Sequence, residues 1–183
     1  SGTLKRAKKL KLITFSGEDV FADLEIPDRC FRRDIKEDCE EAFNEDETSK
    51  MLSYLMANQD PKNLGILLMF VTGIRVGELV AIRNDSLENG CIFIRRTEIK
   101  FFDYEKNANV YEVKEFPKSA AGIREVVIPK DYSWLYSKLT ELNPEGEYVF
   151  LADDGTRMTT NCIRNRLRRL CHKLDIHEKS PHK

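Results

Sequence analysis

Residues 61–71 constrain the fold most, because almost every side chain in this segment is apolar. Its apolar residues are Leu64, Ile66, Leu67, Leu68, Met69, Phe70 and Val71. Proline is tolerated in the first turn of a helix, so Pro61 can open one, and Gly73 interrupts the apolar run. A helix that is apolar on all sides is buried among other elements. We therefore expect a helix that begins at Pro61 and lies in the core.

The spacing of apolar residues predicts further helices on both sides of this segment. Residues 4–14 are typical of a short basic helix. Asn44, followed three residues later by Glu47, matches a capping box at the start of a second helix. Asp131 is the expected cap of a third. The last helix has one apolar face, formed by Ile163, Leu167, Leu170, Cys171 and Leu174.

Between these helices the pattern changes to one that is typical of strands. β-branched and apolar residues recur in segments 92–97, 110–114 and 124–128. Turn residues separate the segments, at 107–109 and at 120–122. We expect one antiparallel sheet inserted between helices. The predicted fold class is therefore mainly α with a small three-stranded antiparallel β-sheet (α+β).

The length of 183 residues fits one domain with a short appendage. The polar stretch 16–43 has little periodicity and is expected to be a linker. It would separate a short helix in residues 1–15 from a domain that spans residues 44–183.

The sequence carries no signal for export or for a membrane helix. No apolar run approaches the roughly 20 residues that a membrane helix requires. The start at Ser1 lacks the apolar region of a signal peptide. The five cysteines are an odd number and are scattered, which indicates reduced thiols inside a cell. We therefore expect a cytoplasmic protein.

The charges nearly cancel but are unevenly distributed along the chain. Thirty basic and 31 acidic residues give a net charge of −1. Acidic residues crowd segment 37–47, and basic residues dominate segment 157–183. A basic helix near the end fits either a nucleic-acid surface or an ordinary solvated face. Charge alone favours the solvated face.

Arg75 follows the apolar helix and stands next to a glycine break. A buried arginine requires a partner, and Glu78, one helical turn later, can supply it. Two interpretations remain open from the residues alone. Either the pair is structural, or the guanidinium of Arg75 is held in place to bind a phosphate, because its planar fork of donors matches the geometry of phosphate oxygens.

Three segments stand in an order that points to one family. Residues 72–79 resemble a first arginine motif, residues 117–129 a β-hairpin lysine segment, and residues 178–183 the approach to a His-x-x-Arg motif. Together they resemble the catalytic domain of the tyrosine recombinases, the phage integrase family. The sequences of these segments are most similar to those of integrases of conjugative transposons and other mobile elements. The resemblance covers residues from about 40 to 183, and residues 1–15 resemble the last helix of a preceding core-binding domain.

The resemblance implies that a tyrosine attacks a DNA phosphodiester and forms a 3′-phosphotyrosyl link. Arg75 would clamp the scissile phosphate, and Glu78 would hold Arg75 in place. Lys118 would donate a proton to the leaving 5′-oxygen, with Lys114 as the rival for this role. His182 would contact the phosphate and assist proton transfer. Arginines would take the role that a divalent cation plays elsewhere, so neither a metal nor another cofactor is expected.

The resemblance also implies that the last helix and the sheet face DNA. The candidate DNA-binding residues are Arg164, Arg166, Arg168 and Arg169 on the helix, which begins near Thr159 or Thr160, and Thr97, Lys100 and Arg124 on the sheet. The implied partners are double-stranded DNA and other copies of the protein, as a tetramer on paired sites in the nucleoid. The Cys and His residues near the end match no standard zinc spacing. They are Cys162, Cys171, His172, His177 and His182.

The sequence departs from the family pattern near its end. The second motif arginine would fall three positions after His182, and the sequence stops at Lys183. All six tyrosines precede His182, so none takes the position of the nucleophile. We therefore expect this chain by itself not to cleave DNA. Two other hypotheses remain: a DNA-binding remnant or regulator without cleavage activity, and a helical adaptor whose Arg75–Glu78 pair is structural.

Overall fold

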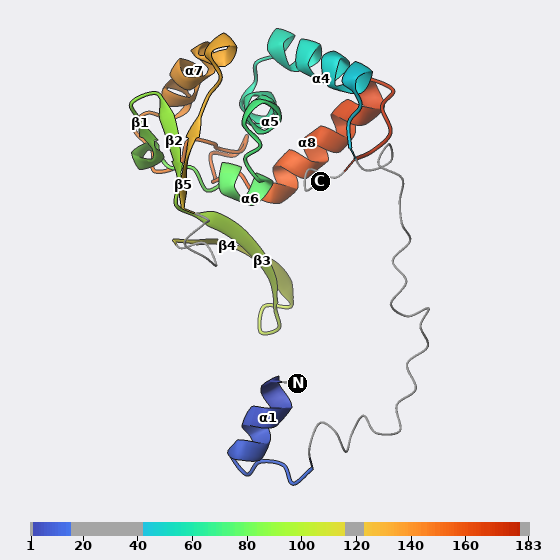
Figure 1. Ribbon diagram of the computed structural model, residues 1–183, viewed down its shortest axis with the longest axis vertical. Coiled ribbons are helices and arrows are strands. Elements are labelled where there is room, and N and C mark those ends of the chain that lie inside the picture. The colour runs from blue at the N-terminus through green and yellow to red at the C-terminus, as the bar shows by residue number, and fades with distance from the viewer. Residues whose placement is uncertain (1, 16–41, 116–122, 180–183) are drawn as a thin grey trace. The chain divides into compact units, whose positions relative to one another are not determined.

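The computed structural model describes residues 2–15, 42–115 and 123–179 (Figure 1). The chain divides into two units, Ser1–Lys36 and Glu37–Lys183. The helices are α1 (Gly2–Lys9), α4 (Glu45–Ala57), α5 (Pro61–Thr72), α6 (Val76–Leu79), α7 (Trp134–Leu142) and α8 (Thr160–Lys173). The strands are β1 (Leu87–Glu88), β2 (Cys91–Ile94), β3 (Thr97–Asp103), β4 (Ala108–Lys114) and β5 (Arg124–Val127). Within the described ranges, every helix is too short or too polar to cross a membrane.

The first unit contains the short helix α1, which ends earlier than the sequence predicts. Apolar spacing predicts a helix over residues 4–14, whereas α1 ends at Lys9. The chain turns at Lys11, whose φ of 56° lies in the left-handed region. The N–H of Leu12 donates to the carbonyl of Ala7 at 3.0 Å. This bond belongs to a Schellman motif, which satisfies a terminal carbonyl and stops the helix.

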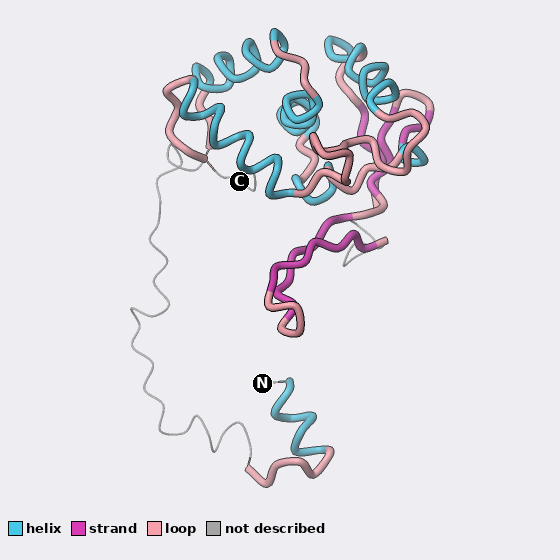
Figure 2. The backbone as a smooth tube through the Cα atoms, turned by 180° about the vertical axis from the view of Figure 1, so that it is seen from behind, coloured by secondary structure: helices cyan, strands magenta, loops and turns pink. Residues whose placement is uncertain are grey.

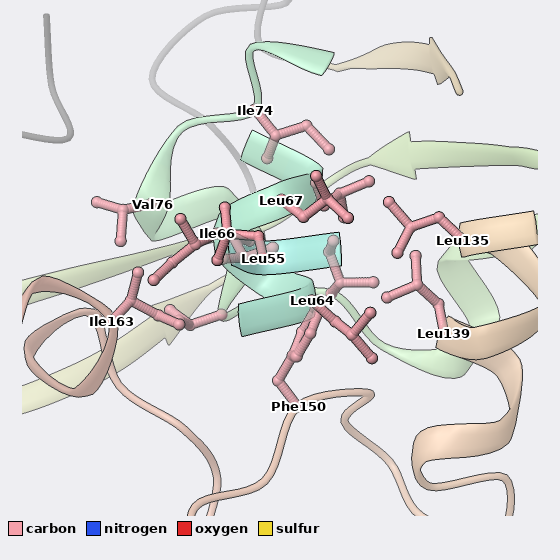
Figure 3. Packing of buried hydrophobic residues seen from close by; sticks show 14 of the residues in the cluster. Leu55, Leu64, Ile66, Leu67, Ile74, Val76, Leu135, Leu139, Phe150 and Ile163 are labelled. Carbon is pink, nitrogen blue, oxygen red and sulfur yellow. The ribbon is translucent and has the colours of Figure 1, made fainter. Parts of the chain in front are cut away.

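Helix α5 lies at the centre of the second unit, as its apolar sequence predicts. Helices α4, α6, α7 and α8 lie around it in both views (Figures 1 and 2). Its residues 63–68 are all buried. Figure 3 shows the surrounding core, in which α5 side chains lie among Leu55, Val76, Leu135, Leu139, Phe150 and Ile163. The core therefore includes side chains from each of the five α-helices that the structure describes in the second unit, α4 to α8.

Side-chain caps determine where α4 and α5 begin. Asn44 Oδ1 accepts from the N–H of Glu47 at 2.9 Å, and the Glu47 carboxylate accepts from the N–H of Asn44 at 2.9 Å. This reciprocal pair confirms the predicted capping box. Before Pro61, Asp60 accepts from the N–H of Asn63 at 3.0 Å and caps α5.

The predicted cap of α7 is wrong by two residues. Asp131 lies in a short 3-10 helix, Lys130–Tyr132, and Ser133 stands at the N-cap position of α7. The N–H of Tyr132 donates to the carbonyl of Pro129 at 2.9 Å. An extra turn therefore precedes the helix, and it moves the helix start beyond Asp131.

The predicted fold class is confirmed, but the strands form two sheets rather than one. Strands β1, β2 and β5 make a three-stranded antiparallel sheet in the order β1–β2–β5, and β3 and β4 make a separate two-stranded sheet. The predicted strand over 92–97 is therefore broken between β2 and β3. At the break Arg96 is mostly buried, and its guanidinium binds Asp85 and Glu115, each at 2.7 Å. These ion pairs hold the base of the β3–β4 hairpin, which extends away from the helices (Figure 1).

Candidate active site

The turn after α5 places Arg75 at the surface rather than in the core. Gly73 ends α5 in the left-handed region, with a φ of 69°. Beyond it, Ile74 and Val76 are buried, whereas the side chain of Arg75 is 73% exposed. The expectation of a buried arginine is therefore wrong. The left-handed glycine redirects the chain, so that Arg75 points outward while its two neighbours point into the core.

The backbone of Arg75 is held firmly even though its side chain is exposed. Arg75 stands at the N-cap position of α6, and its N–H donates to the carboxylate of Glu78 at 3.0 Å. Its carbonyl accepts from the N–H groups of Glu78 and Leu79, each at 2.9 Å. The guanidinium therefore extends from a fixed point of the backbone.

Glu78 is the buried centre of this turn and binds two arginines. Its side chain is 6% exposed, and Arg124 donates to its two carboxylate oxygens at 2.9 and 2.7 Å. The expected contact with Arg75 is present, but it is longer, with Nη1 and Oε1 3.3 Å apart. Burial raises the pKa of Glu78, but hydrogen bonds from Arg124 and from the N–H of Arg75 outweigh burial and lower that pKa below its ordinary value. Glu78 is therefore ionised at neutral pH.

Two residues expected to face DNA lie against this turn. Arg124, at the start of β5, binds Glu78. Thr97, at the start of β3, lies beside Gly77: a Cβ on this glycine would be 2.9 Å from Thr97 Oγ1 and 3.0 Å from the carbonyl oxygen of Glu98. Helix α6 therefore packs directly on β3. The contact of either residue with DNA stays a prediction.

Replacing Gly77 by alanine is expected to lower the free energy of unfolding by about 1–3 kcal/mol, the usual cost of overpacking. The new methyl group would meet a backbone carbonyl, which cannot swing aside as a flexible side chain can. Urea unfolding followed by circular dichroism measures the change. Ser137→Ala, on the exposed side of α7, is the control and should change stability by less than about 0.5 kcal/mol. Equal stability of the two variants would contradict the close approach.

A buried carboxylate on β3, absent from the predicted site, joins the hairpin to α8. The side chain of Glu98 is fully buried. It accepts from the N–H of Thr160 at 2.8 Å and from Arg157 Nη1 at 2.5 Å. Glu98 thus caps α8, whose N-cap residue Thr159 makes no capping bond with its side chain. The sequence did contain a signal for this residue. Glu98 lies four positions after the apolar Ile94, so in an alternating strand the two side chains point to the same, inward face.

The arginines of α8 fall into two groups: one binds the neighbouring helix α5, and the others are exposed. Arg166 donates to Asn63 Oδ1 at 2.8 Å and pairs with Asp60, so it ties α8 to the start of α5. The exposed arginines are Arg164, Arg168 and Arg169, and Lys173 at the end of α8 is exposed as well. An open hollow of about 200 Å³ between α5 and α8 is lined by Lys62, Cys162, Asn165, Arg166 and Arg169. This hollow has basic residues and no carboxylate in its lining.

The remaining candidates lie on the β3–β4 hairpin or outside the described residues. Lys100 is exposed on β3, with its Nζ 5.7 Å from the ring of Tyr111. Lys114, the rival general acid, is the last residue of β4. Lys118 and His182 lie outside the described residues. Among those that are described, no three His, Cys, Asp or Glu side chains are arranged to hold a metal ion.

Ion pairs anchor the chain on both sides of segment 116–122, which contains the predicted general acid. Before it, Glu115 binds Arg96 at 2.7 Å. Hydrogen bonding by Arg96 lowers the pKa of Glu115. After it, Arg124 binds Glu78 at 2.7 Å. The chain therefore enters this segment from the base of the hairpin and leaves it at the turn that carries the exposed arginine.

Comparison with known families assigns the chain to one of them. The model described as "Phage integrase family" matches residues 37–183, which are the whole of the second unit. The chain therefore belongs to the phage integrase family, the tyrosine recombinases. This finding confirms the resemblance drawn from the sequence motifs. No curated protein matches the chain in sequence.

Solved structures of recombinases share this fold. The Tn1549 transposon integrase in complex with transposon right end DNA has a TM-score of 0.67 and 17% identity, over 86% of this chain and 54% of that chain. XerA recombinase has a TM-score of 0.58 and 17% identity, over 88% of this chain and 51% of that chain. A lambda integrase tetramer bound to a Holliday junction has a TM-score of 0.50 and 15% identity, over 87% of this chain and 42% of that chain. The chain thus spans about half the length of the first two.

Proposed function

We propose that this chain is the catalytic domain of a site-specific DNA recombinase that cuts and rejoins DNA through a 3′-phosphotyrosyl intermediate. The observation that supports this function best is the guanidinium of Arg75, exposed on a fixed turn and backed by a buried carboxylate. A guanidinium fork matches the geometry of a phosphodiester. Membership of the phage integrase family supports the same class of reaction.

Negative charge develops on phosphate oxygens during this reaction, and preorganised cations stabilise it. Arg75 clamps the scissile phosphate, and Glu78 fixes the turn that carries Arg75. Lys118 donates a proton to the leaving 5′-oxygen, which is worth roughly 10²–10⁴-fold in rate. His182 contacts the phosphate and assists proton transfer from the tyrosine. No step in this scheme requires a metal or another cofactor.

The whole protein's organisation is part of the same proposal. Residues 1–15 contain the last helix of a core-binding domain, residues 16–43 are the linker, and residues 44–183 are the catalytic domain. The linker lies almost wholly outside the described residues. Copies assemble as a tetramer on paired DNA sites in the cytoplasmic nucleoid, by analogy with the tetramer of lambda integrase on a Holliday junction.

Arg168→Ala and Arg169→Ala are expected to weaken DNA binding whatever the sequence. Each lost phosphate contact should reduce the slope of log K against log salt by about 0.9. Fluorescence anisotropy with a labelled duplex, between about 50 and 200 mM salt, measures this slope. Arg166→Ala is the comparison on the same helix: because Arg166 binds α5, it should cost about 1–3 kcal/mol of stability and leave the slope unchanged. Equal salt slopes for all three variants would contradict the division of the α8 arginines into those that contact DNA and Arg166, which stabilises the fold.

The covalent intermediate tests the proposed function directly. Protein expressed from the complete reading frame would be incubated with duplexes selected from a random-sequence pool for tight binding, and then denatured in detergent. We expect a stable adduct with protein on the 3′ end of the cut strand and a free 5′-hydroxyl. Salt-dependent binding without an adduct would favour a DNA-binding remnant or regulator. Absence of DNA binding would favour a helical adaptor.

A further inference from the structure

We propose that Arg124 is a positioning residue, which occupies the carboxylate of Glu78 and so keeps the guanidinium of Arg75 available for phosphate. This inference rests on the proposed function, because it assigns Arg75 a phosphate to bind. It replaces a direct DNA contact as the role of Arg124.

The distances show that Arg124 is the principal partner of Glu78. Its Nη1 and Nη2 make two bonds to the two carboxylate oxygens, at 2.9 and 2.7 Å. Paired bonds of this kind fix both groups in one plane and are stronger than single ones. Arg75 makes one side-chain contact with Glu78, at 3.3 Å. The Arg124 side chain is 32% exposed and that of Arg75 is 73% exposed, so Arg75 is the more accessible of the two.

The charges explain why this division matters for phosphate binding. Two guanidinium groups and one carboxylate leave the turn with a net charge of +1. Without Arg124, the buried carboxylate of Glu78 would have Arg75 as its nearest charged partner, three residues away on the same turn. A buried carboxylate that lacks a partner is costly, so Glu78 would draw the Arg75 guanidinium inward. The turn would then be neutral, and the fork would no longer face a ligand.

The pair also connects two distant parts of the chain. Arg124 and Glu78 are 46 residues apart. Arg124 begins β5, where it lies opposite Ile94 of β2. The exposed arginine is therefore positioned by the three-stranded sheet as well as by its own turn.

The first test asks whether the phosphate clamp depends on Arg124. In protein expressed from the complete reading frame, Arg124→Ala should slow adduct formation by about 10²-fold, the effect of a misplaced reacting group. The salt slope of DNA binding should fall by about 0.9, because the captured Arg75 guanidinium would leave its phosphate. An unchanged rate of adduct formation or an unchanged salt slope would overturn the inference. Arg95→Ala, which removes another partly exposed arginine nearby, is the matched control and should leave both quantities unchanged.

Second-site variants test whether Arg124 acts through Glu78. Adding Glu78→Gln to Arg124→Ala removes the charge that would capture Arg75, so part of the lost rate should return. Arg124→Lys keeps the charge with a single donor group and should fall between Arg124→Ala and the unaltered protein. If Arg124→Ala does not fold, the rate of adduct formation by Arg124→Lys tests the positioning role instead. A double variant as slow as Arg124→Ala, or a lysine variant with the full rate, would contradict the proposed role.

Nuclear magnetic resonance of the arginine side chains gives a readout that needs no catalysis. In the unaltered chain, the guanidinium of Arg124 should rotate slowly and that of Arg75 rapidly. In Arg124→Ala, the Arg75 guanidinium should become immobilised. If no adduct ever forms but these signals behave as expected, the proposed function fails while the pairing stands. If Arg75 is equally mobile in both chains, the inference itself is wrong.

Discussion

Arg75→Ala is expected to slow formation of the covalent DNA adduct by about 10²–10³-fold, as when one preorganised donor is removed from an active site. The substitution should leave the fold intact. The side chain is 73% exposed, and the hydrogen bonds that fix the turn come from the backbone of Arg75. We expect its free energy of unfolding to change by less than about 0.5 kcal/mol. Urea unfolding and a denaturing gel of the DNA–protein adduct measure the two quantities.

Arg75→Lys sharpens this experiment, because it keeps the charge and removes the planar fork. If the fork matters, the lysine variant should bind DNA with the same salt dependence and still form the adduct slowly. The control is Arg95→Ala, which should behave like the unaltered protein. A folded Arg75→Ala variant that forms the adduct at the normal rate would exclude Arg75 as the phosphate clamp. Loss of folding would instead support the structural interpretation of the Arg75–Glu78 pair.

Glu98→Ala is expected to lower the free energy of unfolding by about 3–5 kcal/mol, the cost of removing one member of a buried ion pair. The substitution would leave the mostly buried guanidinium of Arg157 without its carboxylate. It would also remove the acceptor for the N–H of Thr160, at the start of α8. The urea midpoint, measured by circular dichroism, reports the loss.

Two variants separate the charge of Glu98 from its position. Glu98→Gln keeps the size and one acceptor oxygen, so its loss should be smaller than that of Glu98→Ala. Glu112→Ala removes an exposed carboxylate from β4 of the same hairpin and should change stability by less than about 0.5 kcal/mol. Similar losses for Glu98→Ala and Glu112→Ala would show that the buried pair does not stabilise the domain.

Elements that depend on neighbours in the sequence were predicted well. The buried helix at Pro61 and the capping box of Asn44 and Glu47 are both present. Each depends on side chains within one or two turns of helix, so a local pattern contains the necessary information. The family was also predictable, because its motifs are short and occur in a fixed order. The split of the sheet was not predicted. At the break, Arg96 binds Asp85 and Glu115, which lie in other segments of the chain, so a local pattern does not contain these contacts.

The sequence by itself determined the helical core, the strand-forming segments, and the arginine motif that indicates the family. Only the tertiary structure decided which charged and polar groups pair between distant parts of the chain. Arg124 and Glu78 are 46 residues apart, and Thr160 and Glu98 are 62 apart. Neither pair has a spacing that a helix or strand period could reveal. Pairs of this kind depend on which surfaces the core brings together, and burial then makes an unpaired carboxylate too costly to leave alone.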